Sequence, residues 1–303
     1  MIFRKLNKAP PQKKLKNLEN TFKTGNRSVF KKGEVNNMTR EMMMKEIQNR
    51  GYSVQAKDVE QNGVTSQGII IKRENSNRAI ICIDGVLNDT EYSLDEAVDI
   101  VLEAFERARD CIVSKEQIER KEYILPNLFI GLRKNSTEGD IKRKTENFDG
   151  IESYLYVRLN VQEDASIDVT QKILEKAGIT VEEAWKVAES NTYGETIIQS
   201  VTELLGLPFD REVKDTMPMC AVTNPRRRYG ASGILNKKAL KKVADKYGIS
   251  KLLVLPSSIH EMMILPYTDD TDMDEMNNMV QEVNAMEVMP REQLADRAFV
   301  INL

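Results

Sequence analysis

Residues 252–266, with the sequence LLVLPSSIHEMMILP, decide the fold of this chain. They form two apolar runs, each ending in proline, on either side of the only histidine, His260. Short apolar runs around a turn-forming segment are typical of a β-hairpin with buried strands. The pattern therefore predicts core strands at 252–255 and 262–265.

Further strands and helices extend outward from this hairpin. Capping boxes at Ser93-Leu94-Asp95-Glu96 and Thr180-Val181-Glu182-Glu183 mark two helix starts. A turn cluster at 74–77 predicts a hairpin between its flanking strands. We expect strands at 52–60, 66–73, 78–84, 127–133, 153–161, 219–223, 229–235 and 299–302, and helices at 94–108, 168–178 and 237–247 and starting near 39, 180 and 272.

Strands joined by short turns and interleaved with helices predict an α+β fold, with antiparallel sheets and helices packed on one face. The first part has the order αβββαββα, and a similar order after Pro208 suggests two related halves. We therefore divide the chain into a 39–178 half and a 179–303 half. The order in the first half also resembles that of type III secretion chaperones, which bind other polypeptides.

Charge is distributed unevenly along the 303 residues. Residues 1–38 contain ten Lys or Arg and two Glu, a net charge of +8, whereas the whole chain has −3. The remainder is therefore acidic. Without apolar periodicity, residues 1–38 cannot bury enough surface to order alone, and we predict a disordered basic arm.

Cysteine usage and hydropathy favour a cytoplasmic protein. Cys82, Cys111 and Cys220 have no paired spacing typical of zinc or of a redox dithiol. The first residues lack the apolar core of a signal peptide, and no run approaches the ~20 apolar residues that span a membrane.

The hairpin turn contains the candidate catalytic residues Ser257, Ser258, His260 and Glu261. A serine nucleophile needs a histidine and a carboxylate that usually come from separate elements. Residues this close in one turn rarely converge in that way, so the simpler interpretation is a structural turn. A hydrolase or metal-dependent enzyme using His260 stays open as a third hypothesis.

No cofactor or metal site is predicted. The sequence contains neither a Gly-x-Gly-x-x-Gly nor a Walker A motif. Asp270, Asp272 and Asp274 have EF-hand spacing, but Glu275 and Gln281 replace the Gly and Glu that such a loop needs. The acids instead fit the start of a helix, whose dipole favours negative charge.

A basic block follows the strand at 219–223. Residues 226–246 carry eight Lys or Arg against Asp245, whereas residues 261–296 carry ten acids against Arg291. The block either binds a polyanion such as nucleic acid or pairs with the acidic segment. The candidate binding residues are Asn224, Arg226, Arg227, Arg228 and Tyr229.

Methionine is concentrated near the C-terminus, where Met273, Met276, Val280 and Val283 recur at helical spacing. Flexible thioethers suit both adaptable binding grooves and irregular cores. We expect this stripe to belong to the core.

The segment 222–235, VTNPRRRYGASGIL, followed by LPSSIHE at 255–261, resembles the C-terminal signature of domain of unknown function 5688. The resemblance is strongest over 220–296, weakens toward Thr39 and leaves the basic arm outside. This family occurs mainly in gut Firmicutes and implies a bacterial protein, with no activity to transfer.

The first functional hypothesis is a non-enzymatic protein-interaction module with an unknown protein partner, bound through a sheet edge or the surface around 224–236 and 256–266. It rests on the lack of catalytic signatures and the chaperone-like order. The alternative is nucleic-acid or polyanion binding through the basic arm and the block from Arg226 to Lys246.

Overall fold

The structure is a computed structural model that describes residues 38–72, 79–89, 91–110, 115–137, 139–159, 166–204 and 217–303. Residues 38–303 form a compact unit. The predicted arm, apart from Met38, and the predicted turn at 74–77 lie outside the described residues, as does Cys111.

The first sheet, sheet A, is antiparallel with the strand order β1-β2-β3. Thr39 caps the first helix by accepting the Met42 N–H on its side-chain oxygen. The elements of this region are α3 (Arg40–Asn49), β1 (Ser53–Gln61), β2 (Val64–Lys72), β3 (Ala79–Cys82), α4 (Asp84–Leu87) and α5 (Leu94–Asp110).

The predicted capping box at the start of α5 is confirmed. The backbone N–H of Ser93 donates to the Glu96 carboxylate at 2.9 Å, and the Glu96 N–H donates to Ser93 Oγ at 3.3 Å. These bonds satisfy two backbone amides that a helix start leaves without partners. The apolar face of α5 joins side chains of α3 and β2 in one buried cluster, which includes Met43, Ile47, Ile69, Ile71, Val98 and Phe105.

Sheet B is built around β6, which pairs antiparallel with β4 on one edge and with β5 and β7 on the other. The helix α9 packs against β4, where Thr192 Oγ1 accepts the buried Ile130 N–H at 3.0 Å. The elements here are α6 (Lys115–Ile118), α7 (Lys121–Ile124), η1 (Leu125–Asn127), β4 (Leu128–Lys134), β5 (Lys142–Lys144), β6 (Ile151–Arg158), β7 (Ser166–Asp168), α8 (Gln171–Ala177) and α9 (Val181–Gly194).

Sheet C has the order β12-β10-β11-β9-β8, and its pairs are antiparallel. The predicted hairpin of residues 252–266 forms β10 and β11, which lie inside this sheet. The elements are β8 (Ile197–Ser200), α10 (Val201–Leu204), β9 (Cys220–Thr223), η3 (Gly230–Leu235), α11 (Lys237–Lys246), β10 (Lys251–Ser258), β11 (Glu261–Pro266), α12 (Met273–Glu287), η4 (Pro290–Glu292) and β12 (Phe299–Asn302).

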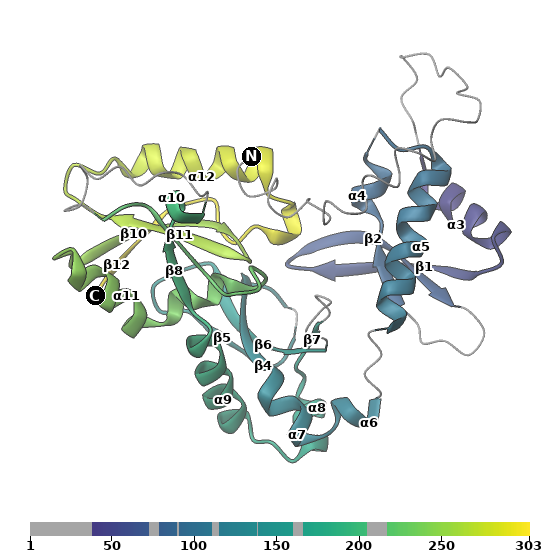
Figure 1. Ribbon diagram of the computed structural model, residues 1–303, viewed down its shortest axis with the longest axis horizontal. Coiled ribbons are helices and arrows are strands. Elements are labelled where there is room, and N and C mark those ends of the chain that lie inside the picture. Colours follow the sequence, from purple (N-terminus) through teal and green to yellow (C-terminus); the bar gives the residue numbers. More distant parts are fainter. Residues whose placement is uncertain are drawn as a thin grey trace. The chain divides into compact units, whose positions relative to one another are not determined.

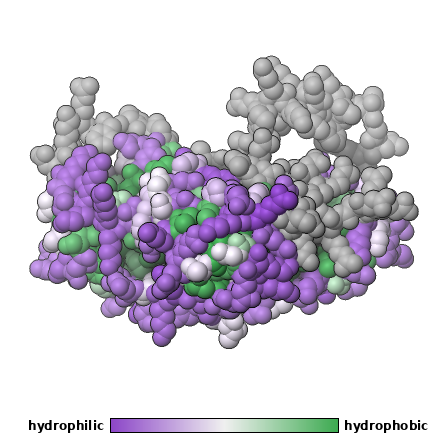
Figure 2. All heavy atoms as spheres, turned by 90° about the horizontal axis from the view of Figure 1, so that it is seen from below, coloured by the Kyte–Doolittle hydropathy of each residue, from purple (hydrophilic) through white to green (hydrophobic). Residues whose placement is uncertain are grey.

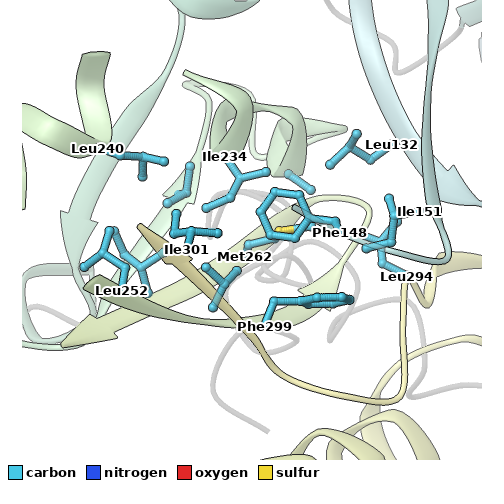
Figure 3. Close-up of a cluster of buried hydrophobic side chains, with 14 of the residues drawn as sticks. Leu132, Phe148, Ile151, Ile234, Leu240, Leu252, Met262, Leu294, Phe299 and Ile301 are labelled. Atoms are coloured by element: carbon cyan, nitrogen blue, oxygen red, sulfur yellow. The ribbon is translucent and has the colours of Figure 1, made fainter. Parts of the chain in front are cut away.

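Both faces of β10 are covered. Leu252 and Val254 are fully buried in a cluster with Leu240 of α11. Figure 3 shows that the side chains of this cluster come from strands, η3 and connecting segments. Leu253 and Leu255 are also buried, and because successive residues of a strand point to opposite faces, they face the side where α12 contacts β10 (Figure 1). The α+β class with antiparallel sheets is thus confirmed, but sheet C carries helices on both faces and not on one.

The strand predicted at 229–235 is wrong. This segment is η3, a 3-10 helix that begins after Tyr229 in the left-handed region at φ 53°. A Cβ on Gly230 would lie 2.6 Å from Thr223 Oγ1 and 2.8 Å from the His260 carbonyl oxygen. Gly230 therefore allows β9 and the hairpin turn to approach this segment closely, and it does not belong to a strand.

The predicted division between residues 178 and 179 stays a prediction. A single buried cluster contains Val169 and Leu174, before that position, together with Trp185 and Ala188 after it. Gly178 itself ends α8 in the left-handed conformation at φ 64°, as its place after the predicted helix indicates.

The face seen in Figure 2 is mainly hydrophilic, with separate small hydrophobic areas. This agrees with the mean hydropathy of −0.46. Within the described part of the chain, no helix combines the length and apolar character needed to cross a membrane.

Candidate functional site

The turn after β9 is braced by the side chain of Asn224. Its amide Nδ2 donates to the Arg228 carbonyl at 2.8 Å, and its Oδ1 accepts the Arg226 N–H at 3.0 Å. Arg227 and Tyr229 both have φ near 53°, a region that non-glycine residues enter at a free-energy cost. Asn224, only 7% exposed, thus offsets the strain of a tight turn from inside.

His260 locks this turn to the β10–β11 hairpin. Its Nδ1 accepts the backbone N–H of Tyr229 at 3.1 Å, and its ring stands edge-on to the Tyr229 ring at 5.7 Å. Its Nε2 lies 3.7 Å from Oε1 of Glu292, which belongs to η4. Because Nδ1 accepts, the neutral ring carries its proton on Nε2 and keeps no free lone pair. This arrangement suits a structural lock and not a general base.

The pKa values of the two glutamates near His260 are shifted in opposite directions. Burial raises the pKa of Glu261, and the electrostatic interactions with His260 and Arg227 oppose this only in part. Burial also acts on the pKa of Glu292, but the contact with His260 and the positive charges of Arg291 and Arg228 outweigh it and lower this pKa. The carboxylate that faces Nε2 is thus Glu292, and not the sequence neighbour Glu261.

The serines of the turn do not reach the imidazole as nucleophiles. Ser258 Oγ accepts the His260 backbone N–H at 3.1 Å, and Ser257 sits where the hairpin register shifts between Pro256 and Ser258. Both roles belong to the turn itself. The four candidate catalytic residues therefore lie close together, but they do not form a hydrogen-bonded chain of nucleophile, base and carboxylate.

The candidate binding residues divide into two groups. Asn224 and Tyr229 are used inside the protein, Tyr229 through packing at 5.1 Å on Tyr156. Arg226 and Arg227 are half-buried and Arg228 is exposed. Their proposed role in binding stays a prediction, and it rests now on the three arginines.

Sequence reasoning missed an aromatic and ionic group on sheet B. Tyr154 is paired in register with Gly131, and a Cβ at Gly131 would lie 2.5 Å from the Tyr154 ring. The Arg133 guanidinium lies 4.6 Å from the centre of the same ring and bonds to Glu152 at 2.7 Å. A glycine inside an apolar strand is the available signal, since it marks a close approach.

The helix α12 exposes part of its apolar stripe. Val280 is buried as predicted, whereas Val283 is 37% exposed. Met279 and Met286, at helical spacing from Val283, are 40% and 68% exposed. Of the predicted stripe, Met273 and Met276 are half-buried, so the prediction that the stripe belongs to the core is wrong for Val283. Met279 and Met286 extend the exposed apolar face beyond that stripe.

The basic helix α11 does not pair with the acidic segment. Its lysines face solvent, and the salt bridges seen for it join Lys237 to Glu146 at 2.8 Å and Lys241 to Asp245 at 3.3 Å. Neither partner acid lies in 261–296. The lysines of α11 thus do not pair with that segment, whereas Arg227 and Arg228 of the same basic block act electrostatically on its Glu261 and Glu292.

Metal-ligating side chains do not converge: among the described residues, no group of three His, Cys, Asp or Glu side chains is arranged to hold an ion. Cys82 and Cys220 are free thiols. Burial raises the pKa of the Cys220 thiol to about 11, so this thiol stays protonated at neutral pH.

A family model described as "Family of unknown function (DUF5688)" matches residues 30–301. The chain belongs to this family. The DUF5688 match begins inside the predicted basic arm, before the point near Thr39 to which the sequence resemblance extends. No curated protein and no solved structure matches the chain.

Proposed function

We propose that this DUF5688 chain is a protein-interaction module that receives a basic amphipathic helix of another polypeptide on the outer face of α12. The exposed stripe of Met279, Val283 and Met286 carries the proposal. Flexible, unbranched thioethers adapt to apolar side chains of a partner helix.

Charge defines the chemistry of the partner. The helix α12 contains no Lys or Arg, and Glu275 and Glu282 lie on the same side as the exposed stripe, at helical spacing from Met279 and Met286. Negative charges that border an apolar stripe favour a partner with Lys or Arg beside its own apolar face.

This face suits docking better than the surface around 224–236 and 256–266. In those segments Ala231, Ile234 and Met262 are at most 2% exposed, and the polar groups brace one another. The outer face of α12 instead leaves apolar side chains in water, where a partner gains by covering them.

The experiment compares two triple variants of the full chain. One replaces Met279, Val283 and Met286 by Ser, and the matched control replaces Lys238, Lys241 and Lys242 on α11 by Ser. A labelled Lys-Leu amphipathic peptide is the probe, and a Glu-Leu peptide is its control. We expect the stripe variant to lose at least about tenfold in affinity for the basic peptide, while the α11 variant keeps it.

Equal affinity of the wild type and the stripe variant would refute the proposal, as would preference for the acidic peptide. A photo-crosslinker at position 286 then maps the natural partner in lysate of the source organism. The expected crosslinked segment is a helix with apolar and basic faces. Crosslinks to an extended strand or to nucleic acid would also contradict it.

The second candidate is polyanion binding, which the exposed lysines of α11 favour. Lys238, Lys242 and Lys246 face solvent beside the partly neutralised Lys237 and Lys241. We expect the affinity for DNA or RNA to fall steeply as the salt concentration rises. Charge reversal of Lys238 and Lys242 should make this dependence on salt less steep. Deletion of 1–38 separates the contribution of the predicted arm, and salt-independent or absent binding would exclude this candidate.

We also propose a cytoplasmic setting. The free thiols of Cys82 and Cys220 support it, since a reducing compartment keeps cysteines unpaired. Fractionation of the source cells tests the location, and recovery of the protein outside the cytoplasmic fraction would contradict it.

A further inference from the structure

A polar cavity of about 360 Å³ lies where sheet B meets the His260 turns. Its lining includes Arg133, Tyr154, Asp168, Tyr229 and Arg291. This volume falls within the range of small-molecule sites, and a few polar groups that converge on one cavity are what such sites use for specificity.

Tyr154 contributes a hydrogen-bonding group to the lining of the cavity. The residue is 8% exposed and lines the cavity, and its hydroxyl makes no hydrogen bond among the described residues. Burial raises the pKa of Tyr154 well above its ordinary value, so the hydroxyl stays a donor at neutral pH. A ligand that accepts a hydrogen bond from this hydroxyl therefore gains binding free energy.

Strand pairing holds Tyr154 in this position. Its ring lies over Gly131, where any side chain would collide with it, and the Arg133 guanidinium packs on the ring. Arg133 is fixed in turn by Glu152 at 2.7 Å and by Asp168 at 3.3 Å. The cavity wall is therefore preorganised, which reduces the entropy lost on binding.

Arg291 provides the cation that the fold does not neutralise by contact. No salt bridge of Arg291 is seen within the described part of the chain, and its Nη2 donates a hydrogen bond to the Met289 sulfur at 3.7 Å. Its charge also acts on the neighbouring Glu292. Its backbone is anchored, because the Asn62 amide donates to the carbonyls of Arg291 and Gln293 at 3.1 and 2.6 Å. The side chain thus belongs to a fixed segment while its guanidinium stays available.

We propose that this cavity binds a small carboxylate. The Arg291 guanidinium pairs with the carboxylate, and the Tyr154 hydroxyl donates a hydrogen bond to the ligand. Tyr229, which also lines the cavity and whose hydroxyl has no hydrogen bond among the described residues, offers a second donor. Arginine recognises carboxylates through two parallel hydrogen bonds, which gives both energy and orientation.

Isothermal titration of the full chain with succinate, L-glutamate and ethylamine tests the site. We expect at least one carboxylate to bind with a Kd of about 1 mM or lower and ethylamine not to bind. Tyr154→Phe and Arg291→Gln should each weaken that binding at least about tenfold. Unliganded Tyr154→Phe should unfold at about the same urea concentration as wild type, because the removed hydroxyl makes no hydrogen bond among the described residues.

Tyr123→Phe is the matched control. The Tyr123 hydroxyl donates to the Leu159 carbonyl at 2.7 Å, and this residue is not part of the cavity lining. Its loss should lower stability and leave carboxylate binding unchanged. Failure of both carboxylates to bind the wild type, or full binding by Tyr154→Phe, would overturn the proposal.

Discussion

The backbone N–H of Tyr229 donates to Nδ1 of His260 at 3.1 Å and so joins two turns that are 31 residues apart. The bond uses the one ring nitrogen that a general base would need free. The only histidine of the chain thus connects the arginine-rich turn after β9 to the central hairpin of sheet C.

Replacement of His260 tests this lock. His260→Ala leaves the Tyr229 N–H without its acceptor, and we expect the free energy of unfolding to fall by about 1 to 3 kcal/mol. His260→Asn should recover part of the loss, because the Asn oxygen lies near the place of Nδ1. Urea denaturation measures both, and equal midpoints for wild type and His260→Ala would show that the bond does not stabilise the fold.

Gly230 should tolerate no side chain. A Cβ there meets Thr223 Oγ1 at 2.6 Å, the Asn224 backbone N at 2.7 Å and the His260 carbonyl oxygen at 2.8 Å. Two of these atoms are backbone and cannot move alone, so we expect Gly230→Ala to lower stability by more than about 2 kcal/mol.

Gly194→Ala is the control for Gly230. Gly194 lies at the end of α9, and a Cβ added there would meet no atom within 4 Å. Alanine at this position should leave stability unchanged or raise it by up to about 1 kcal/mol. Similar thermal midpoints for both variants would contradict the close approach at Gly230.

Local signals in the sequence predicted much of the fold. The Ser93 capping box, Gly178 at the end of α8 and the two apolar runs around His260 each depend on neighbours a few residues away, and the structure contains all three. These elements are specified by short-range hydrogen bonds and by apolar patterning, which a single sequence displays.

The site depends on partners far away in the sequence. Glu292 reaches His260 from η4, and Gly131 makes room for Tyr154 across a strand pair. The Glu292 contact has no local signature, and a glycine inside an apolar strand indicates a close approach without identifying its partner. The failed strand at 229–235 has the same cause, because contacts of Gly230 with β9 and the hairpin turn override the apolar pattern of that segment.

Glu261 and Glu292 should respond oppositely to substitution. The pKa of Glu261 is raised by burial, so its ionised form destabilises the fold once pH rises above its ordinary pKa. The pKa of Glu292 is lowered, so its charge stabilises the fold above the ordinary pKa, and this stability is lost as pH falls through the folded value.

At pH 7 we therefore expect Glu261→Gln to raise the free energy of unfolding and Glu292→Gln to lower it. The loss in Glu292→Gln should shrink as pH falls below the ordinary glutamate pKa of about 4.3. Urea midpoints across acidic and neutral pH measure both effects. A shift of the same sign for both variants at pH 7 would contradict the assignment of Glu292 as the partner of His260.

Arg133 and Glu152 form a buried cross-strand pair, with side chains 5% and 7% exposed. Arg133→Met leaves the buried Glu152 carboxylate with Lys142, whose Nζ is 3.4 Å away, and with the Ser136 hydroxyl at 3.1 Å. We expect a loss of about 2 to 3 kcal/mol, since a buried charge that loses its better-placed partner is unfavourable. The double variant with Glu152→Leu should recover most of this loss, because it removes the stranded charge.

The ion pair of Lys237 and Glu146, with side chains 72% and 79% exposed, is the solvent-exposed control for the buried pair of Arg133 and Glu152. Lys237→Met should leave the urea midpoint unchanged, because water solvates and screens both charges. If Arg133→Met were as mild as Lys237→Met, the buried pair would not stabilise sheet B. The wall that holds Tyr154 against the cavity would then lack the rigidity that the proposed carboxylate site requires.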